Sequence, residues 1–190
     1  MSSKPIWQSF PILETERLCL RQITAADADD LFAIFSDKET MEYWSCRPYT
    51  SVSQAHRLIE SLEETARQEA GIHWAITLRG ENRLIGSCGF NEWRKQHRRG
   101  EISYIIARHT WGKGIVSEAL RVMLDYGFKE MNLHSVEAGV TPGNDGSTRM
   151  LERLGFRLEG HLRENYFAED RFVDSLIYSL LLRDWNADGD

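Results

Sequence analysis

Two glycines one residue apart, Gly112 and Gly114, mark the segment of this sequence whose residue types best suit ligand chemistry. They follow a strand-forming run at 101–107 and precede an amphipathic helix expected over 114–130. Glycine lets the backbone turn tightly and brings its N–H groups close to a ligand. The first N–H groups of a helix lack partners, and that end of the helix carries partial positive charge. Together, the strand, glycine loop and helix start predict a cradle for an anion, most often phosphate.

The spacing of this loop excludes two common phosphate-binding motifs. A Walker A loop needs Gly-x-x-x-x-Gly-Lys-Ser/Thr, whereas Lys113 lies between the glycines and no Ser/Thr follows it. A dinucleotide fingerprint needs a third glycine at position 117, which is Ser117. Taken alone, the two glycines also fit an ordinary strand-to-helix turn.

With its flanks, segment 108–120 resembles motif A of the GNAT acyltransferases, in which Gln/Arg-x-x-Gly-x-Gly/Ala binds the pyrophosphate of acetyl-CoA. Gly112 and Gly114 match the motif, and His109 stands at its Gln/Arg position. Trp-Gly-Lys-Gly-Ile and Ser-Glu-Ala-Leu resemble, more narrowly, the RimJ/RimL-like branch, which acetylates the N-termini of ribosomal proteins. Further segments resemble this branch in the right order, namely 15–21, 27–31, 132–144, 147–156 and 159–160.

The resemblance implies where acetyl-CoA binds. Backbone N–H groups from about Trp111 to Val116 would hold the pyrophosphate, and the main chain of strand 101–107 would pair with the pantetheine arm. Lys113 either adds charge beside the phosphates or faces solvent. Asn144 stands where the family has an asparagine that contacts the cofactor, although asparagine also favours helix caps. The expected cofactor-binding residues are Ile106, Ala107, Arg108, Trp111, Gly112, Lys113, Gly114, Ile115, Val116, Asn144 and Ser147.

Acetyl transfer to an amine requires a positioned thioester and a neutral attacking nitrogen, and the leaving thiolate can take up a proton. By the resemblance, Ser147 lies near the sulfur as the candidate acid, because the tyrosine that many GNAT enzymes use is Leu151 here. Glu101 stands where many of them place a glutamate that acts through water. Tyr166 lies where the branch contributes acceptor-site residues, with Glu164 two residues before it. Each of these residues also has a purely structural interpretation.

Other residues have weaker functional interpretations. We expect Asp174 to make a structural hydrogen bond. Four aromatic residues either line an acceptor groove or pack in the core and at its rim, namely Trp44, Tyr49, Phe90 and Trp93. The six histidines and three widely spaced cysteines show no metal-ligand spacing, so no metal site is expected.

The pKa of the acceptor limits how strong a base the site needs. An α-amino group titrates near 8, so roughly a tenth is neutral at pH 7, whereas a lysine amine is neutral in less than about one part in a thousand. The predicted function is therefore transfer of an acetyl group from acetyl-CoA to a protein N-terminal α-amine, by direct attack in a ternary complex. A ribosomal protein is the leading acceptor. A small amine (polyamine, amino acid or amino-sugar antibiotic) or a non-catalytic CoA-binding module remains an alternative.

Length and composition set the broad class of the protein. A chain of 190 residues suggests a single domain over 1–190. A net charge of −6 argues against nucleic acid as a partner. The sequence lacks an apolar run long enough to span a membrane, and its start lacks the apolar core of a signal peptide. The odd number of cysteines suggests reduced thiols and hence a cytoplasmic protein. A homodimer is one expected assembly.

The pattern of apolar residues predicts the elements that must position these groups. Strands are expected at 16–22, 72–79, 83–92, 100–107, 133–140, 156–166 and 171–182, and helices at 25–36, 54–69, 114–130 and 145–154. Ser53 is the expected N-cap of the second helix, and residues 1–14 are a lead-in. The order indicates a mixed α/β fold, GNAT-like, with about seven mostly antiparallel strands flanked by about four helices. GNAT domains, which this order resembles, splay two central strands to admit the cofactor.

Overall fold

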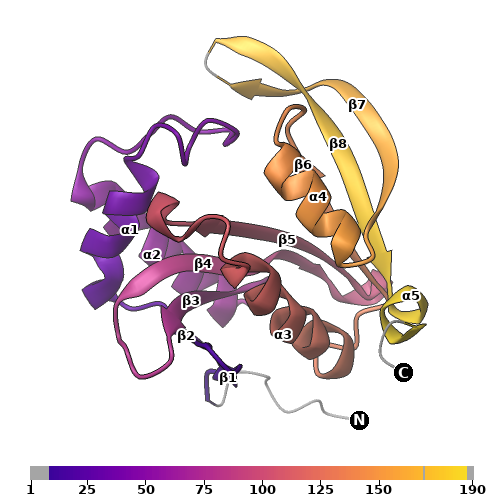
Figure 1. Cartoon of the computed structure of the whole chain (residues 1–190), viewed down its shortest axis with the longest axis horizontal. Helices are drawn as coiled ribbons and strands as arrows, with labels where there is room; N and C mark the ends of the chain where they lie inside the picture. Colours follow the sequence, from indigo (N-terminus) through magenta and orange to yellow (C-terminus); the bar gives the residue numbers. More distant parts are fainter. Residues whose placement is uncertain (1–8, 169, 188–190) are drawn as a thin grey trace.

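A computed structural model describes residues 9–168 and 170–187 of the chain. One sheet holds eight strands in the order β1-β2-β3-β4-β5-β6-β8-β7 (Figure 1). The strands are β1 (Leu13–Glu14), β2 (Leu18–Gln22), β3 (Ile72–Leu78), β4 (Leu84–Arg94), β5 (Arg99–Ile106), β6 (Ser135–Val140), β7 (Arg157–Ala168) and β8 (Arg171–Leu181). The helices are α1 (Ala28–Phe35), α2 (Val52–Arg67), α3 (Ile115–Lys129), α4 (Asp145–Arg153) and α5 (Leu182–Ala187). The mixed, mostly antiparallel fold is thus confirmed.

Three details differ from the sequence prediction. Strand β1 lies within the expected lead-in, because its two residues are strand only through pairing with Leu20 and Cys19 of β2. The last strand ends at Leu181, and the short helix α5 follows it. The N-cap of α2 is Ser51 rather than Ser53, because Gln54 accepts a hydrogen bond from the backbone N–H of Ser51 (3.2 Å) in a capping box.

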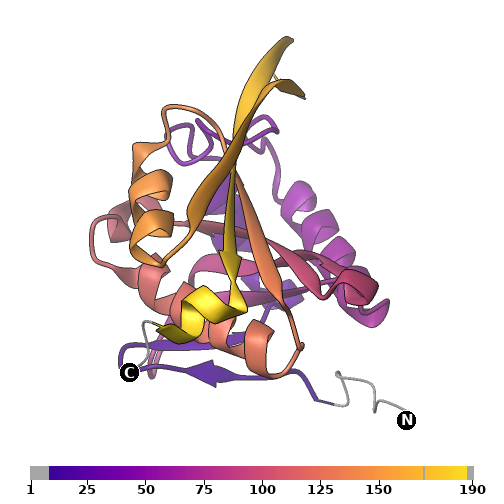
Figure 2. The ribbon, with the colours of Figure 1, turned by 90° about the vertical axis from the view of Figure 1, so that its right-hand side faces the viewer.

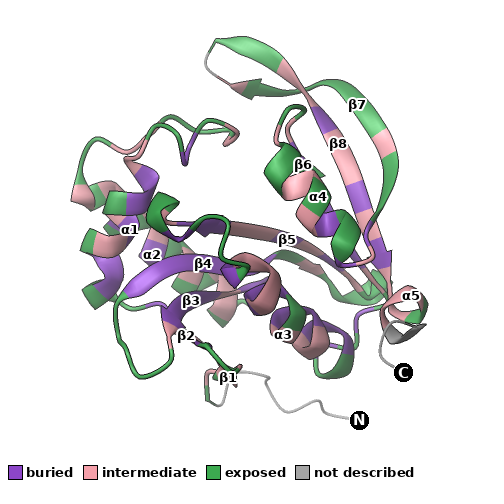
Figure 3. Ribbon diagram, in the orientation of Figure 1, coloured by how far each residue is buried: buried purple, intermediate pink, exposed green. Residues whose placement is uncertain are grey.

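Helices cover the sheet on both faces, and each face has its own core. Helix α3 packs on one face against Leu20, Trp74 and Phe90, all fully buried. Helices α1 and α2 pack on the other face, around Ala75 and Ile105. Figure 2 shows α2 and α3 on opposite sides of the strands, and Figure 3 shows burial concentrated along β3 and β4. No helix of the described residues has the length and hydrophobicity needed to cross a bilayer.

The central strands β5 and β6 are joined by the crossover helix α3 and pair in parallel over a short length. Within the described chain, their pairing covers only Arg99–Glu101 against Ser135–Glu137. Beyond this point the strands separate, as the sequence prediction expected. The edge of β5 from Ile102 to Ile106 that faces β6 therefore has no strand partner among the described residues. Strands β7 and β8 rise beyond the rest of the sheet as a two-stranded ribbon (Figure 2).

Candidate acetyl-transfer site

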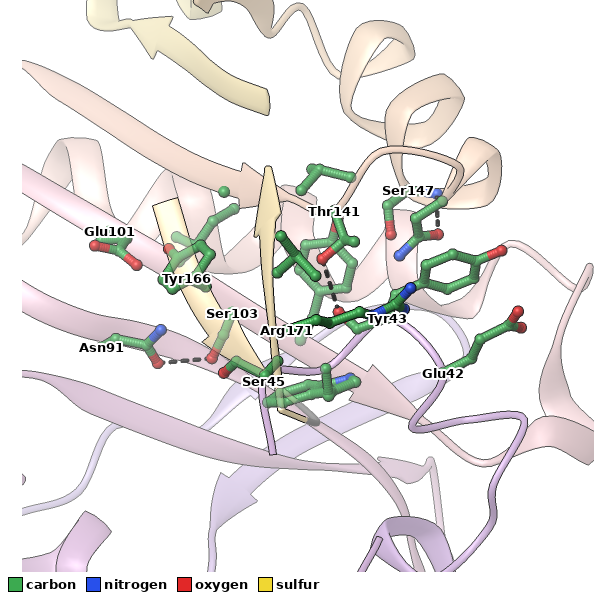
Figure 4. Close-up of a pocket in the computed structure, with 18 residues that line it drawn as sticks. Glu42, Tyr43, Ser45, Asn91, Glu101, Ser103, Thr141, Ser147, Tyr166 and Arg171 are labelled. Atoms are coloured by element: carbon green, nitrogen blue, oxygen red, sulfur yellow. Dashed lines mark hydrogen bonds between the residues drawn. The ribbon is translucent and has the colours of Figure 1, made fainter. Parts of the chain in front are cut away.

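A cavity of about 340 Å³ opens where β5 and β6 separate (Figure 4). Six parts of the chain enclose it: β4, β5, the end of β6, the start of α4, the β7–β8 ribbon and the loop after α1. Its lining residues are Glu42, Tyr43, Trp44, Ser45, Asn91, Glu101, Ile102, Ser103, Tyr104, Gly139, Val140, Thr141, Asn144, Ser147, Tyr166, Ala168, Arg171 and Val173. The cavity brings together Glu101, Ser147 and Tyr166, the three candidate catalytic residues. These residues are far apart in sequence.

The glycine loop between β5 and α3 has the geometry of an anion cradle. Gly112 and Gly114 adopt left-handed φ angles of 72° and 73°, which favour glycine over other residues. Helix α3 begins directly after Gly114. Within the described residues, the backbone amides of 112–114 donate to no protein acceptor. A Cβ at Gly112 would have no atom within 4 Å, so this side of the loop is open to a ligand. These features fit the diphosphate of CoA.

Arg17, the residue before β2, holds the glycine loop in place. Its Nη1 donates to the carbonyl of Lys113 (3.0 Å), and its Nε donates to Glu118 in the first turn of α3 (2.6 Å). The hydroxyl of Thr15 donates to the same carboxylate (2.5 Å). Burial favours protonation of Glu118, but the hydrogen bonds from Thr15 and Arg17 outweigh it and lower the pKa. The pair thus fixes the loop and neutralises a carboxylate that would otherwise repel phosphate.

The other expected cofactor-binding residues next to the loop have varied surroundings. The guanidinium of Arg108 pairs with Glu39 (2.6 Å), so it points to the loop after α1. The indole of Trp111 is half exposed, and its Nε1 donates to the carbonyl of Ile106 (3.2 Å). The remaining residues are exposed at Lys113, partly buried at Ala107 and Val116, and buried at Ile106 and Ile115.

Ser147 and Asn144 form one end of the cavity at the start of α4. Asn144 is the N-cap of this helix, and its Oδ1 accepts a hydrogen bond from the backbone N–H of Ser147 (3.2 Å). The capping interpretation of Asn144 is therefore confirmed, and its contact with the cofactor stays a prediction. Tyr104 of β5 lines the cavity beside Ser147. Burial raises the pKa of Tyr104 to about 12, and the nearby hydroxyl of Ser147 opposes this shift only weakly, so the phenol stays protonated.

Glu101 and Tyr166 form the other end of the cavity. Burial, reinforced by the negative charge of Glu92, raises the pKa of Glu101 above its ordinary value, while Arg94 and Arg99 oppose the shift. A raised pKa suits a carboxylate that accepts a proton near neutral pH. The pKa of Tyr166 is also raised, first by burial and then by the charge of Glu101.

An irregularity in β7 places Tyr166 in the cavity. The register between β7 and β8 shifts between Leu162 and Tyr166. Within this stretch Glu164 has a left-handed φ of 52°, and its N–H donates to Asp174 (2.8 Å). Asp174 also contacts Nε2 of His161 (2.6 Å), which confirms its structural hydrogen bond. Glu164 is not among the cavity residues, whereas Tyr166 is.

Of the four aromatic candidates for an acceptor groove, one lines the cavity and the other three make packing contacts. Trp44 lines the cavity. Tyr49 stacks on Phe35 at 4.9 Å, Phe90 is fully buried in the core, and Trp93 lies under the ammonium of Lys95 at 4.5 Å. No group of three possible metal ligands occurs within the described ranges.

Several polar residues of the cavity were not predicted from the sequence. They are Glu42, Tyr43, Ser45, Asn91, Ser103, Tyr104, Thr141 and Arg171. For Ser103 the signal was available, because strand alternation places it on the same face of β5 as Glu101. Tyr104 lies on the opposite face of the strand, so alternation from Glu101 does not mark it. The loop residues Glu42, Tyr43 and Ser45 reach the site only through tertiary packing, so no local pattern marks them.

Comparison with known proteins agrees with this geometry. The family model described as acetyltransferase (GNAT) domain matches residues 17–157. The chain is 39% identical over 173 residues to "Uncharacterized N-acetyltransferase p20" of Bacillus licheniformis, which covers 91% of this chain and 97% of that protein. It is 27% identical over 183 residues to "Putative ribosomal N-acetyltransferase YdaF" of Bacillus subtilis, covering 94% of this chain and 99% of that protein.

A solved structure supports the same assignment. The spermidine N-acetyltransferase from Vibrio cholerae, in complex with CoA and spermine, superimposes with a TM-score of 0.79 at 28% sequence identity. The match covers 90% of this chain and 99% of that one. The relatives therefore agree on the reaction, and their names differ in the amine that accepts the acetyl group.

Proposed function

Because the chain belongs to the GNAT family of acetyl-CoA-dependent N-acetyltransferases, we propose that its acceptor is the N-terminal α-amine of a protein, with a ribosomal protein as the leading candidate. The charged residues that line the cavity support this proposal. The described lining has two carboxylates, Glu101 and Glu42, and one guanidinium, Arg171. One excess negative charge suits a substrate with a single amine. A polyamine carries several ammonium groups, which would favour more carboxylates.

The residues around the cavity have complementary roles in this proposal. Acetyl-CoA supplies the activated acetyl group. The amides of 112–116 hold its diphosphate, and the free edge of β5 aligns its peptide-like arm. Glu101 accepts a proton from the amine, directly or through water, and Ser147 donates a proton to the departing sulfur. Tyr104 remains protonated beside Ser147.

Replacing Ser147 with alanine is expected to lower kcat by about tenfold, with a change of less than about twofold in the dissociation constant for CoA. The loss is smaller than the full contribution of a general acid, roughly 10²-fold or more, because the Tyr104 phenol still lies beside the gap. Single-turnover kinetics and calorimetry measure the two quantities. Thr148→Ala is the matched control, since Thr148 also lies in the first turn of α4 and its hydroxyl donates to Asp145 (3.2 Å). A change in affinity alone would exclude Ser147 as the acid.

A polyamine is the second candidate acceptor, favoured by the likeness to the spermidine N-acetyltransferase of Vibrio cholerae. A panel of N-terminal peptides and polyamines, assayed with acetyl-CoA by release of free thiol, separates the two. We expect kcat/KM for the preferred peptide to exceed that for spermidine by at least about tenfold. Preference for spermidine would overturn the proposed acceptor and leave the acetyltransferase assignment intact. CoA binding without turnover of any amine would support the non-catalytic module instead.

A further inference from the structure

Three side chains form a hydrogen-bonded row across neighbouring strands and end in the cavity. His73 of β3 lies opposite Gly89 of β4, and Gly89 lies opposite Ser103 of β5. Asn91, also on β4, links the two outer residues. Its Oδ1 lies 2.8 Å from Nε2 of His73 and 2.6 Å from Oγ of Ser103. Figure 4 shows the second contact beside Glu101 and Tyr166.

Gly89 makes this row possible. A Cβ at Gly89 would lie 2.5 Å from the imidazole ring of His73 and 2.3 Å from the carbonyl of Ile72. Real Cβ atoms do not approach so closely, so any larger residue would displace the ring. The glycine thus provides the space in which His73 lies across β4 toward Asn91.

The donors and acceptors of this row have one favourable arrangement. Burial lowers the pKa of His73 to about 4, so its imidazole is neutral and carries one N–H. Its Nδ1 atom is buried and has no partner in the described part of the chain. If Nδ1 carried the hydrogen, a buried donor would lack an acceptor. This costs more free energy than a buried Nδ1 acceptor that lacks a donor. The hydrogen therefore resides on Nε2 and is donated to Asn91.

The assignment at His73 determines the direction of the remaining hydrogen bond. An amide oxygen accepts and cannot donate, so the Ser103 hydroxyl must also donate to Oδ1 of Asn91. The hydroxyl hydrogen of Ser103 is then used inside the protein. Toward a ligand in the cavity, the hydroxyl can therefore only accept a hydrogen bond, through the lone pairs of Oγ. Ser103 is thereby a fixed acceptor, on the same face of β5 as Glu101.

We propose that Ser103 binds the acceptor amine by accepting one of its N–H groups, and that Asn91 and His73 are positioning residues that set the direction of this hydrogen bond. The proposal rests on the acetyl-transfer function of the cavity and deepens it. A primary amine offers several N–H groups in every protonation state. Glu101 and Ser103 accept two of them, which aims the nitrogen lone pair away from β5 and into the cavity.

Steady-state kinetics of Ser103→Ala tests the binding role. We expect KM for the best amine in the panel to rise about tenfold, consistent with loss of one hydrogen bond to a charged or strongly polar group. KM for acetyl-CoA should stay within about twofold. Ser179→Ala is the matched control, because Ser179 is also a strand serine with one hydrogen bond, to Glu159 (2.5 Å), and lies outside the cavity lining. An unchanged amine KM in Ser103→Ala would overturn the proposal.

A double-mutant cycle tests the positioning role. Asn91→Leu removes the acceptor that fixes the Ser103 hydroxyl, so amine KM should rise several-fold. The double variant Asn91→Leu/Ser103→Ala should then be no worse than Ser103→Ala alone, because both changes remove one interaction. Asn91→Asp, which retains an oxygen acceptor, should restore most of the affinity for the amine. If the increases in amine KM of the two single variants multiplied in the double variant, the positioning role would be overturned. Since the readout uses whichever amine is turned over, failure of the N-terminal acceptor would be detected separately in the panel.

Discussion

Replacing Gly112 with valine is expected to weaken CoA binding by more than about a hundredfold, which calorimetry on the folded variant measures directly. The φ of 72° at Gly112 is strained for a β-branched residue by about 1–3 kcal/mol, so the loop would leave its present conformation. The amides of 112–114, which now have no acceptor in the described part of the protein, would then no longer be arranged as they are for a ligand. The new side chain would also occupy the open side of the loop, from which a diphosphate must approach.

Gly80→Val is the matched control for this change. Gly80 has a similar φ of 82°, and a Cβ there would also meet nothing within 4 Å, but it lies in the turn between β3 and β4. Both variants should lose a similar amount of folding stability in thermal unfolding. Only Gly112→Val should lose CoA affinity. Retained affinity in that variant would mean that the diphosphate is held elsewhere.

The sequence predicted the cradle and most of the sheet because both depend on local patterns. The positive φ angles at Gly112 and Gly114 favour glycine, and alternating apolar residues mark β3, β4 and β5. The cap of α2 was assigned wrongly to Ser53 although the Ser51–Gln54 capping box was present in the sequence. Strand β1 was missed because two residues carry no periodic signal.

The rest of the site could not be predicted because its residues meet only in the folded chain. The Arg17–Glu118 pair joins positions 101 residues apart, and neither residue has a local pattern that indicates the other. Tyr166 reaches the cavity only after a register shift in β7 that Asp174 stabilises. The direction of the hydrogen bond of the Ser103 hydroxyl depends on His73, which lies two strands away. A sequence pattern can place residues on a face of a strand, but it cannot specify such hydrogen-bond directions.

Replacing Glu101 with glutamine is expected to lower kcat/KM for the amine by about 10²- to 10⁴-fold, the range over which a positioned general base contributes. The amide is nearly isosteric and cannot accept the proton. The dissociation constant for CoA should change little, because Glu101 lies at the end of the cavity away from the glycine loop. Stopped assays at saturating acetyl-CoA measure the loss.

The pH dependence of the same variant tests whether the reaction needs the ionised form of Glu101. Burial and Glu92 raise the pKa of Glu101, so activity through this carboxylate is lost as the pH falls through that raised value. An α-amine acceptor must also lose a proton, with a pKa near 8. The plot of log kcat/KM against pH should therefore have slope 1 just below pH 8 and slope 2 below the pKa of Glu101. In Glu101→Gln the slope should remain 1 throughout.

Glu92→Gln is the matched control, and it tests whether the pKa of Glu101 is raised by its neighbours. Removing this neighbouring carboxylate deletes a cause that raises the pKa of Glu101, and it frees Arg94, which Glu92 now binds at 2.6 Å, to lower that pKa further. The break between slopes 1 and 2 should therefore move to lower pH, with little loss of activity at neutral pH. If slope 2 persisted in Glu101→Gln, another group would be the base, and Glu101 would only hold the amine. If Glu92→Gln did not move the pH of this break, the part of the profile with slope 2 would belong to a group whose pKa does not depend on the charge of Glu92.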